Sequence, residues 1–442
     1  MPEIRRPQKK RRPRLRFLIA VAAALWIGAA SPSLAAASGG DPWITLGTDA
    51  FASLRAHSTI LYQGEPLPAL EESAGVVLTR IHEADLEAVS QYLHETFERC
   101  SGFLYHGSLE EGRAQLRQAA SRQALGGPAP YVIDQPALVQ SLSDQLDAAN
   151  ILATITTLST SYNNRYYQHP SGVDSATWIR DLWAGYAFGR PEVTVELVQH
   201  TGWAQPSVVM TIPGSSMADE VVVLGGHLDS IASGSSNPNF SAPGADDNAS
   251  GIATLSEVAR VILAQGLHPQ RTLKFMGYAA EEVGLRGSQE IAADHQAGGV
   301  DVVAVLQLDM TAFNGSAQDI LLITDFTNSA LTTFLGELMD TYLGDLTWST
   351  SACGYGCSDH AAWHNRGFPA AFAFEARFGQ HNSRIHSTGD TTANFGGTAA
   401  HAFKFARLAT AFLAELGVDA APALFVDGFE SGDTSAWTSQ EP

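Results

Sequence analysis

From about residue 131 onward, short apolar runs alternate with segments in which apolar residues recur every three or four positions. The short runs are typical of buried strands and the periodic segments of helices. Strands are predicted at residues 193–198, 208–212, 221–225, 272–278, 302–308 and 320–324. Helices are predicted at residues 134–158, 175–188, 251–264, 287–295, 329–343, 358–365 and 398–416. Because nearly continuous apolar strands alternate with helices, we expect an α/β domain over residues 131–418, with a mixed, mainly parallel sheet sandwiched by helices.

The preceding segment, residues 38–130, has a different pattern. Residues 76–81 form an apolar run that predicts a strand, and residues 84–99 predict an amphipathic helix. The helix is indicated by four apolar residues at helical spacing: Leu86, Val89, Leu93 and Phe97. Glycine and proline at 126–130 predict a linker. We therefore expect a small α+β unit, and it carries none of the candidate catalytic residues described below.

The two ends of the chain resemble processing segments. Basic residues between positions 5 and 16 precede an apolar run of 14 residues at 17–30, and small residues follow at 35–37. A bilayer-spanning helix needs about 20 apolar residues. The pattern therefore favours a signal peptide, residues 1–37, over a membrane anchor, and predicts secretion with transit through a periplasm. The acidic, aromatic tail at 419–442 predicts either a sorting or processing motif or a frayed terminus.

Composition and charge narrow the possible partners. The chain has 442 residues, of which 45% are hydrophobic, so it is long enough for more than one globular unit. Its formal charge is -20, yet residues 1–37 carry eight Lys or Arg and one Glu, which leaves the remainder at -27. Such an acidic body argues against nucleic acid as a partner and, once the signal peptide is removed, against membranes.

Cysteine usage predicts one disulfide. Cys353 and Cys357 lie four apart with two glycines between them, which allows a small loop to close, and an exported chain permits the bond. The alternative is a cysteine pair that binds metal. A second pair that would complete a thiolate site does not occur in the sequence, which favours the disulfide. Cys100 lies far upstream.

Five short polar motifs follow apolar strands or lie in glycine-containing loops. They are residues 225–229, 245–248, 280–282, 307–309 and 385–387. Alone, a His at a strand end is more often structural, and Asp or Asn before a helix is more often a cap. Adjacent carboxylates after a buried strand, however, are costly unless a positive charge lies beside them, and a metal supplies one. Together the motifs provide ligands for two divalent metals and a spare carboxylate base, which predicts metal-assisted hydrolysis.

On these motifs and their spacing, residues 131–418 resemble the secreted bacterial leucyl aminopeptidases of metallopeptidase family M28. The residues that carry the resemblance are 225–230, 243–251, 278–288, 306–310, 353–360 and 384–386. The resemblance implies a di-zinc enzyme that hydrolyses the N-terminal peptide bond of peptides and prefers leucine or another large apolar residue there.

The resemblance also implies a ligand set for two Zn²⁺ per chain. Asp247 would bridge the two ions. His227 and Asp309 would complete one site, and Glu282 and His386 would complete the other.

Further residues would act around the metals. Glu281 would be the general base for water held between the metals and then the general acid, and Asp229 would orient His227. The bond between Cys353 and Cys357 would shape the pocket loop. The apolar pocket for the N-terminal side chain would be lined by Met310, Ile323, Tyr355, Phe374, Phe378 and Ile385. His381 is a departure, because close family members carry an aromatic residue there.

The resemblance assigns residues 38–130 to a propeptide, a folding aid and intramolecular inhibitor that is removed on maturation, and we expect a monomer. Two other function classes remain open. A glutaminyl cyclase-like acyltransferase uses similar ligands with one zinc, and two bound zinc ions with leucine-amide hydrolysis would exclude it. A non-catalytic binding protein is disfavoured by the complete ligand set. A carboxypeptidase would need a basic residue for the substrate carboxylate, and the motifs do not supply one.

Overall fold

The computed structural model describes residues 40–57, 59–97, 102–120 and 131–417, and all of them belong to one compact unit, residues 37–442. The predicted signal peptide, Cys100, the linker at 126–130 and the tail at 419–442 lie outside the described residues. We refer to residues 40–120 as the N-terminal subdomain and to residues 131–417 as the main subdomain.

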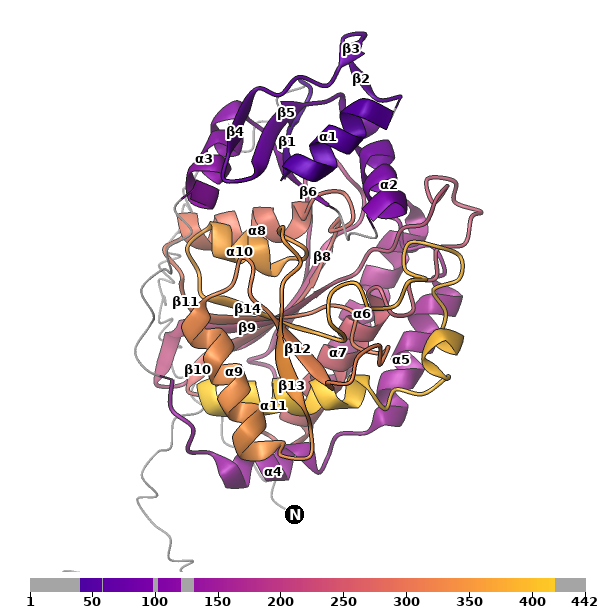
Figure 1. Ribbon diagram of the computed structural model, residues 1–442. Coiled ribbons are helices and arrows are strands. Elements are labelled where there is room, and N and C mark those ends of the chain that lie inside the picture. The colour runs from indigo at the N-terminus through magenta and orange to yellow at the C-terminus, as the bar shows by residue number, and fades with distance from the viewer. Residues whose placement is uncertain (1–39, 58, 98–101, 121–130, 418–442) are drawn as a thin grey trace, which may run out of the picture. The chain divides into compact units, whose positions relative to one another are not determined.

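An eight-stranded sheet forms the centre of the main subdomain, in the order β13-β12-β14-β11-β9-β10-β8-β7 (Figure 1). The strands are β7 (Thr194–Val198), β8 (Ser207–Ile212), β9 (Met217–His227), β10 (Arg271–Tyr278), β11 (Asp301–Leu308), β12 (Ile320–Ile323), β13 (Trp348–Ser351) and β14 (Ala370–Phe374). Four pairings are parallel, namely β9 with β10, β9 with β11, β11 with β14 and β12 with β13. The other three are antiparallel. The prediction of a mixed, mainly parallel sheet is confirmed.

Helices cover both faces of this sheet, as predicted. They are α4 (Pro136–Ser143), α5 (Ala148–Ser161), α6 (Pro170–Tyr186), α7 (Ala249–Ala264), α8 (Arg286–Ala297), α9 (Ser329–Tyr342), α10 (His360–Asn365) and α11 (Ala402–Gly417). Because successive strand residues point to opposite faces, Val222 and Leu224 of β9 join the core formed with α7 and α11, whereas Val221 and Val223 join the core formed with α8 and α10. Figure 1 shows these two helix layers below and above the sheet.

Two details differ from the predictions. The single helix predicted at 134–158 is two helices, because the chain turns after α4 and Asp147 begins α5 by accepting a hydrogen bond from the backbone N–H of Ala149. Strands β13 and β14 were not predicted. β14 is a run of alanine and phenylalanine that is buried throughout, and such a short apolar run does not distinguish strand from helix.

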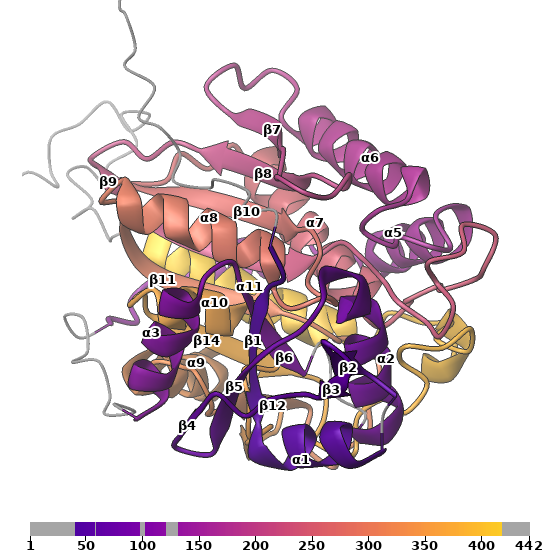
Figure 2. The same cartoon turned by 90° about the horizontal axis from the view of Figure 1, so that it is seen from above.

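The N-terminal subdomain is a small α+β unit, as predicted (Figure 2). Its antiparallel sheet has the order β4-β5-β1-β6. The elements are β1 (Trp43–Gly47), α1 (Thr48–His57), β2 (Leu61–Tyr62), β3 (Glu65–Pro66), β4 (Glu71–Ser73), β5 (Val76–Arg80), α2 (Leu86–Phe97), β6 (Phe103–His106) and α3 (Leu109–Ala120). The predicted strand and helix of this segment correspond to β5 and α2. Residues Leu86, Val89 and Leu93 of α2 pack into the core of this subdomain.

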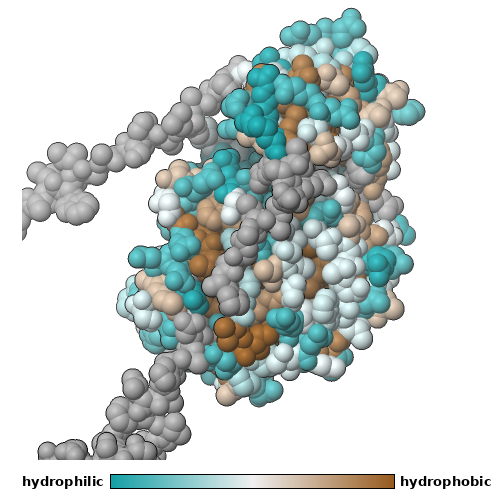
Figure 3. All heavy atoms as spheres, turned by 60° about the vertical axis from the view of Figure 1, so that its left-hand side comes forward, coloured by the Kyte–Doolittle hydropathy of each residue, from teal (hydrophilic) through white to brown (hydrophobic). Residues whose placement is uncertain are grey.

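The surface drawn in Figure 3 mixes hydrophilic side chains with small hydrophobic patches. Large hydrophobic side chains that are exposed include Leu61, Leu70, Val132 and Phe188, which come from separate parts of the sequence. Within the described ranges, no helix combines the length and apolar character that crossing a membrane requires.

Candidate functional site

Three neighbouring parallel strands end at the candidate site. β9 ends at His227, β10 is followed by Glu281 and Glu282, and β11 is followed by Asp309. Because β10 and β11 flank β9 and run parallel to it, their carboxyl ends meet at one edge of the sheet, where α/β proteins place their sites. The strand order therefore brings together four of the predicted residues that lie far apart in the sequence.

Asp247 lies at the centre of the site. Its Oδ1 is 3.1 Å from Nε2 of His227, and its Oδ2 is 2.9 Å from Nε2 of His386. Around the first His, Oδ1 of Asp309 is 3.4 Å from Nε2 of His227; around the second, Oε2 of Glu282 is 3.3 Å from Nε2 of His386. The five predicted ligands thus form two groups that share Asp247.

These spacings are close to those of two tetrahedral metal sites, with the two contacts of Asp247 shorter by a few tenths of an ångström. Metal–ligand bonds of about 2.0–2.2 Å place neighbouring donor atoms of a tetrahedral zinc site about 3.3–3.5 Å apart. The side chains are also buried, with 0% exposure for His227 and 7% for His386. The donor set of two imidazoles and three carboxylates is one that zinc accepts.

Several of the clustered atoms make no hydrogen bond within the part of the chain that the structure describes. They are both side-chain oxygens of Glu281 and of Glu282, Oδ1 of Asp309 and Nε2 of His386. A buried polar atom without a hydrogen bond costs about 1–3 kcal/mol. Such a concentration of them in one place is what a cation-binding site requires, so the residues present fit the two predicted metals.

The protonation of these groups reflects the same crowding. Burial raises the pKa of Glu281 well above its ordinary value, and burial raises that of Glu282 to about 7 despite the attraction of His386. Although burial opposes it, Glu282 and Asp247 raise the pKa of His386 to about 10. The carboxylates of the site keep the neighbouring His386 protonated. A cluster with this much negative charge has a strong electrostatic preference for cations.

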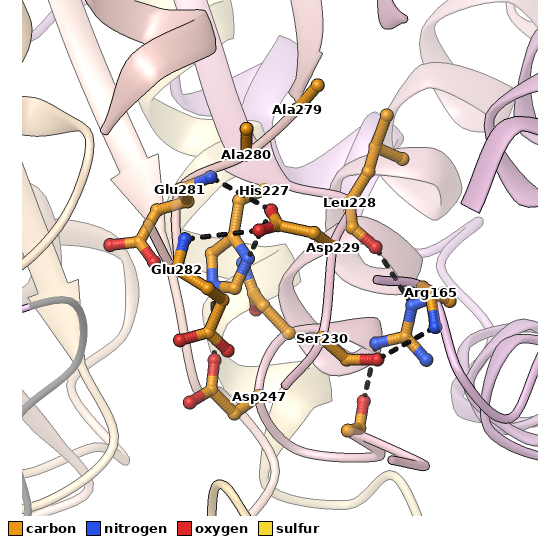
Figure 4. A network of polar contacts seen from close by, with 12 residues as sticks. Arg165, His227, Leu228, Asp229, Ser230, Asp247, Ala279, Ala280, Glu281 and Glu282 are labelled. Atoms are coloured by element: carbon orange, nitrogen blue, oxygen red, sulfur yellow. Dashed lines mark hydrogen bonds and ion pairs between the residues drawn. The ribbon is translucent and has the colours of Figure 1, made fainter. Parts of the chain in front are cut away.

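Asp229 connects the first histidine to the glutamate pair (Figure 4). Its Oδ1 accepts a hydrogen bond from the backbone N–H of Glu281 at 3.0 Å, and its Oδ2 accepts one from that of Glu282 at 3.1 Å. Oδ1 also lies 3.4 Å from Nδ1 of His227. Asp229 is therefore placed beside the His227 ring, as predicted, and it also fixes the backbone that carries both glutamates, which was not predicted.

Left-handed backbone conformations gather at the site. Ala280, Met310 and His386 have φ values of 56°, 56° and 53°, although none is glycine. Such conformations cost roughly 1–3 kcal/mol each and persist where the surrounding structure holds them. Each is a candidate site residue or its direct neighbour, so the backbone here is arranged to aim particular side chains.

Arg165 was missed by the sequence analysis. Its guanidinium is buried and donates a hydrogen bond of 2.9 Å to the backbone carbonyl of Leu228 (Figure 4). It also donates to the carbonyls of Pro243 and Gly244 at 2.6 and 2.9 Å. Burial lowers its pKa to about 10, which leaves it charged at neutral pH. Arg165 ties together the loops that precede Asp229 and Asp247. No pattern marks it, because its three partners in these loops lie more than 60 residues away along the chain.

Two more residues that the sequence analysis did not single out hold the ligands in place. Ser358 donates a hydrogen bond of 2.6 Å to Oδ2 of Asp309, which leaves Oδ1 to face His227. The carboxylate of Asp390 accepts hydrogen bonds from the backbone N–H groups of Asp246 and Asp247 at 3.0–3.2 Å. Ser358 and Asp390 follow the predicted disulfide and the predicted His386, so proximity in sequence was a usable signal.

The six residues predicted to line a pocket share one hydrophobic cluster. Its members are Met310, Ile323, Cys353, Tyr355, Cys357, Phe372, Phe374 and Ile385, with Phe378 packed against them. The disulfide between Cys353 and Cys357 is present, as predicted. Phe372 is the addition that the sequence analysis missed. His381 lies against this cluster, with ring centroids 5.6 Å from Phe374 and 5.1 Å from Phe378.

Helix α2 of the N-terminal subdomain contacts the candidate site through two residues that the sequence analysis did not single out. The ring of His94, from α2, stacks on that of His386 with centroids 3.6 Å apart, and its Nε2 is 3.8 Å from Oε2 of Glu282. Ser90 of the same helix donates a hydrogen bond of 2.5 Å to the backbone carbonyl of Glu282. Two polar residues four apart on the buried side of an amphipathic helix were the available signal.

Comparison with known sequences gives one family and several relatives. The model of peptidase family M28 matches residues 207–411. A probable leucine aminopeptidase of the fungus Arthroderma benhamiae is 41% identical over 266 residues, which cover 59% of this chain and 72% of that protein. Leucine aminopeptidase 1 of Coccidioides posadasii is 35% identical over 313 residues, or 67% of this chain and 78% of the relative.

Solved structures share the fold. The LapA aminopeptidase of Legionella pneumophila superposes with a TM-score of 0.71 at 28% identity, and the match covers 86% of this chain and 99% of that one. BSAP, a zinc aminopeptidase from Bacillus subtilis, matches with a TM-score of 0.52 at 14% identity, over 63% of this chain and 97% of its own. The relatives thus include fungal and bacterial proteins.

Proposed function

Because this chain belongs to peptidase family M28, we propose that it is a two-zinc aminopeptidase that removes leucine or another large apolar residue from the N-terminus of peptides. The observation that carries the proposal is the position of Asp247, whose two carboxylate oxygens face two histidines, each of which has a further carboxylate beside it. Relatives named leucine aminopeptidases and a similar fold in a zinc aminopeptidase support it.

The proposed ligands divide as the geometry groups them. His227 and Asp309 would hold one zinc, Glu282 and His386 the other, and Asp247 would contact both. When bound, the ions would polarise the scissile carbonyl and lower the pKa of the attacking water. Asp229 fixes the position of His227 relative to Glu282. Its carboxylate lies beside the ring of His227 and accepts a hydrogen bond from the backbone N–H of Glu282.

Glu281 is the proposed base. Its carboxylate is fully buried among the ligands and makes no hydrogen bond to any described residue, while its backbone N–H is fixed by Asp229. It can therefore accept a proton from the attacking water and deliver it to the leaving amine. Such positioned proton transfer is worth about 10²–10⁴ in rate.

The hydrophobic cluster would select the substrate. Met310 directly follows the ligand Asp309, and Ile385 directly precedes the ligand His386, so the apolar side chains begin where the ligands end. A substrate whose free α-amine lies beside the carboxylates would direct its first side chain toward Met310, Ile385 and Phe374. Apolar pockets discriminate by about 1–3 kcal/mol per methylene, so a preference for leucine would be graded rather than absolute.

We further propose that the protein is exported by residues 1–37, acts outside the cell as a monomer and is kept inactive by residues 38–130 until they are removed. Burial of the site supports the last point, since Glu281 and Glu282 are 0% and 2% exposed with the N-terminal subdomain in place. Beside His386 there is a small pocket lined partly by Glu87, Gln91 and His94 of α2. A peptide would have to displace α2 to reach the glutamates.

Hydrolysis of leucine p-nitroanilide by protein cut between residues 120 and 131 tests the activity, with N-acetyl-leucine p-nitroanilide as the matched control. Cleavage of the free-amine substrate alone, lost with a zinc chelator and regained with zinc, is the expected result. Equal cleavage of both substrates would rule out an aminopeptidase. Cleavage of neither, with release of ammonia from an N-terminal glutamine instead, would favour the cyclase class.

A further inference from the structure

Helix α2 presents one polar stripe to the main subdomain. Leu86, Val89 and Leu93 bury into the N-terminal core, whereas Ser90 and His94, one helical turn apart, contact the glutamate loop and His386. Ser90 donates a hydrogen bond to the backbone carbonyl of Glu282 and thereby fixes the distance between α2 and that residue. The hydrogen bond places the ring of His94 over the proposed second zinc site.

The atoms of this cluster have the spacing of metal ligands. One donor atom from each of His94, Glu282 and His386 lies within 4.8 Å of the others. The distance from Nε2 of His94 to Oε2 of Glu282 is 3.8 Å, about 0.3–0.5 Å more than donors of a tetrahedral zinc site, which lie about 3.3–3.5 Å apart. Because imidazole binds metal in the plane of its ring, coordination requires the ring of His94 to turn out of its stack on His386 as well as to close that gap.

Among the described residues, Nε2 of His94 has few polar partners. The side chain is 5% exposed, and among the described residues its Nε2 has a single hydrogen-bond contact, a long one of 3.4 Å with Oγ of Ser90. Stacking on His386 places the ring beside a proposed ligand but supplies no hydrogen-bond partner for Nε2, which lies 3.8 Å from Oε2 of Glu282. A fourth protein ligand would complete a tetrahedral site that already has Asp247, Glu282 and His386, and would occupy the position that water or substrate needs.

We propose that, in the uncut protein, His94 is a ligand of the metal held by Glu282 and His386, so that the N-terminal subdomain blocks the enzyme by direct coordination. The inference rests on the proposed function, because it requires a metal at that site. Cutting the chain between residues 120 and 131 would free the segment that carries His94 and open one coordination position.

The test compares uncut protein with three variants. His94→Phe keeps a ring to stack on His386 but has no ligand atom, His94→Ala removes both, and His57→Phe is the matched control at an exposed histidine of α1 in the same subdomain. Zinc release is followed against a competing chelator, and the visible absorption of the cobalt-substituted protein reports the ligands directly.

In the wild-type protein two ions should bind. In both His94 variants, the dissociation constant of one ion should rise at least about tenfold, because removing even a residue that only hydrogen-bonds to a metal ligand has that effect. The cobalt spectrum of both variants should also change. His57→Phe should change neither. After cutting and removal of the N-terminal segment, every variant has the same remaining chain, so all spectra and activities should coincide; a persistent difference would reveal damaged folding.

The outcomes separate the two proposals. Two ions bound with unchanged affinity and spectrum in His94→Phe would overturn the role of His94 and leave the aminopeptidase proposal intact. Absence of bound metal in the wild-type protein would overturn the proposed function itself. A change in His94→Ala alone would assign His94 to packing rather than coordination.

Discussion

Asp229 offers a sharp test of how the site is held together. Asparagine has the shape of aspartate but only one acceptor oxygen, so Asp229→Asn can accept a hydrogen bond from Glu281 or from Glu282 but not from both. Its amide would then face a backbone N–H, donor against donor. The change also removes the negative charge beside Nδ1 of His227.

The size of the effect follows from these contacts. A hydrogen bond to a charged group contributes about 1.5–3 kcal/mol. If its loss is felt entirely in the positions of Glu281 and Glu282, each 1.36 kcal/mol is a factor of ten, so kcat should fall by about 10–150-fold. Zinc affinity should fall about 10–100-fold, since Asp229 supports the ligand His227. The free energy of unfolding should fall by a similar 1.5–3 kcal/mol.

The assay is leucine p-nitroanilide hydrolysis by the cut protein under saturating zinc, together with urea unfolding. Asp219→Asn is the matched control, because Asp219 belongs to the same strand, β9, but is exposed. It should leave both measurements unchanged. Wild-type kcat and zinc affinity in Asp229→Asn would refute the reasoning that this carboxylate positions the glutamates and the histidine.

Three further changes have defined outcomes. Glu281→Gln should keep both zinc ions but lose about 10²–10⁴ in kcat, and near-normal turnover would remove Glu281 from the role of base. Replacing Cys353 and Cys357 together by serine should lower the free energy of unfolding by about 2 kcal/mol, the loop-entropy value for a separation of four residues, as seen in urea melts with reduced wild type as control. The pKa of Asp319 is lowered from 3.8 to about 2, because the hydrogen bonds from Lys404 and Thr347 together outweigh burial, which raises it. This carboxylate therefore stabilises the fold above pH 3.8, and its contribution is lost as pH falls toward 2. Asp319→Asn should therefore be less stable at neutral pH and show a flatter loss of stability over that acid range, whereas an unchanged slope would contradict the pairing.

The sequence predicted those parts of the fold whose patterns are long and unambiguous. The apolar runs that became β9, β10 and β11 end in polar motifs, so both the strands and the ligands that follow them were visible. The glutamates and Asp309 could be assigned to strand ends before their neighbours were known. Strand β14 could not, because five buried alanine and phenylalanine residues carry no alternation of polar and apolar positions.

The parts that escaped prediction depend on contacts between distant segments. Arg165 looks like a surface residue in a polar stretch, and only the folded chain shows that its partners are the carbonyls of Leu228, Pro243 and Gly244. His94 reads as one more polar residue on an amphipathic helix. The spacing of Ser90 and His94 marks a polar stripe on α2, but no local pattern specifies that this stripe lies against Glu282.

Zinc titration of the metal-free, cut protein tests the central claim most directly. Leucine p-nitroanilide hydrolysis should return as zinc is added and level off at two equivalents per chain, with Asp247→Ala binding neither ion tightly. Activity that levels off at one equivalent, or that survives complete removal of zinc, would contradict a site in which Asp247 joins two metals.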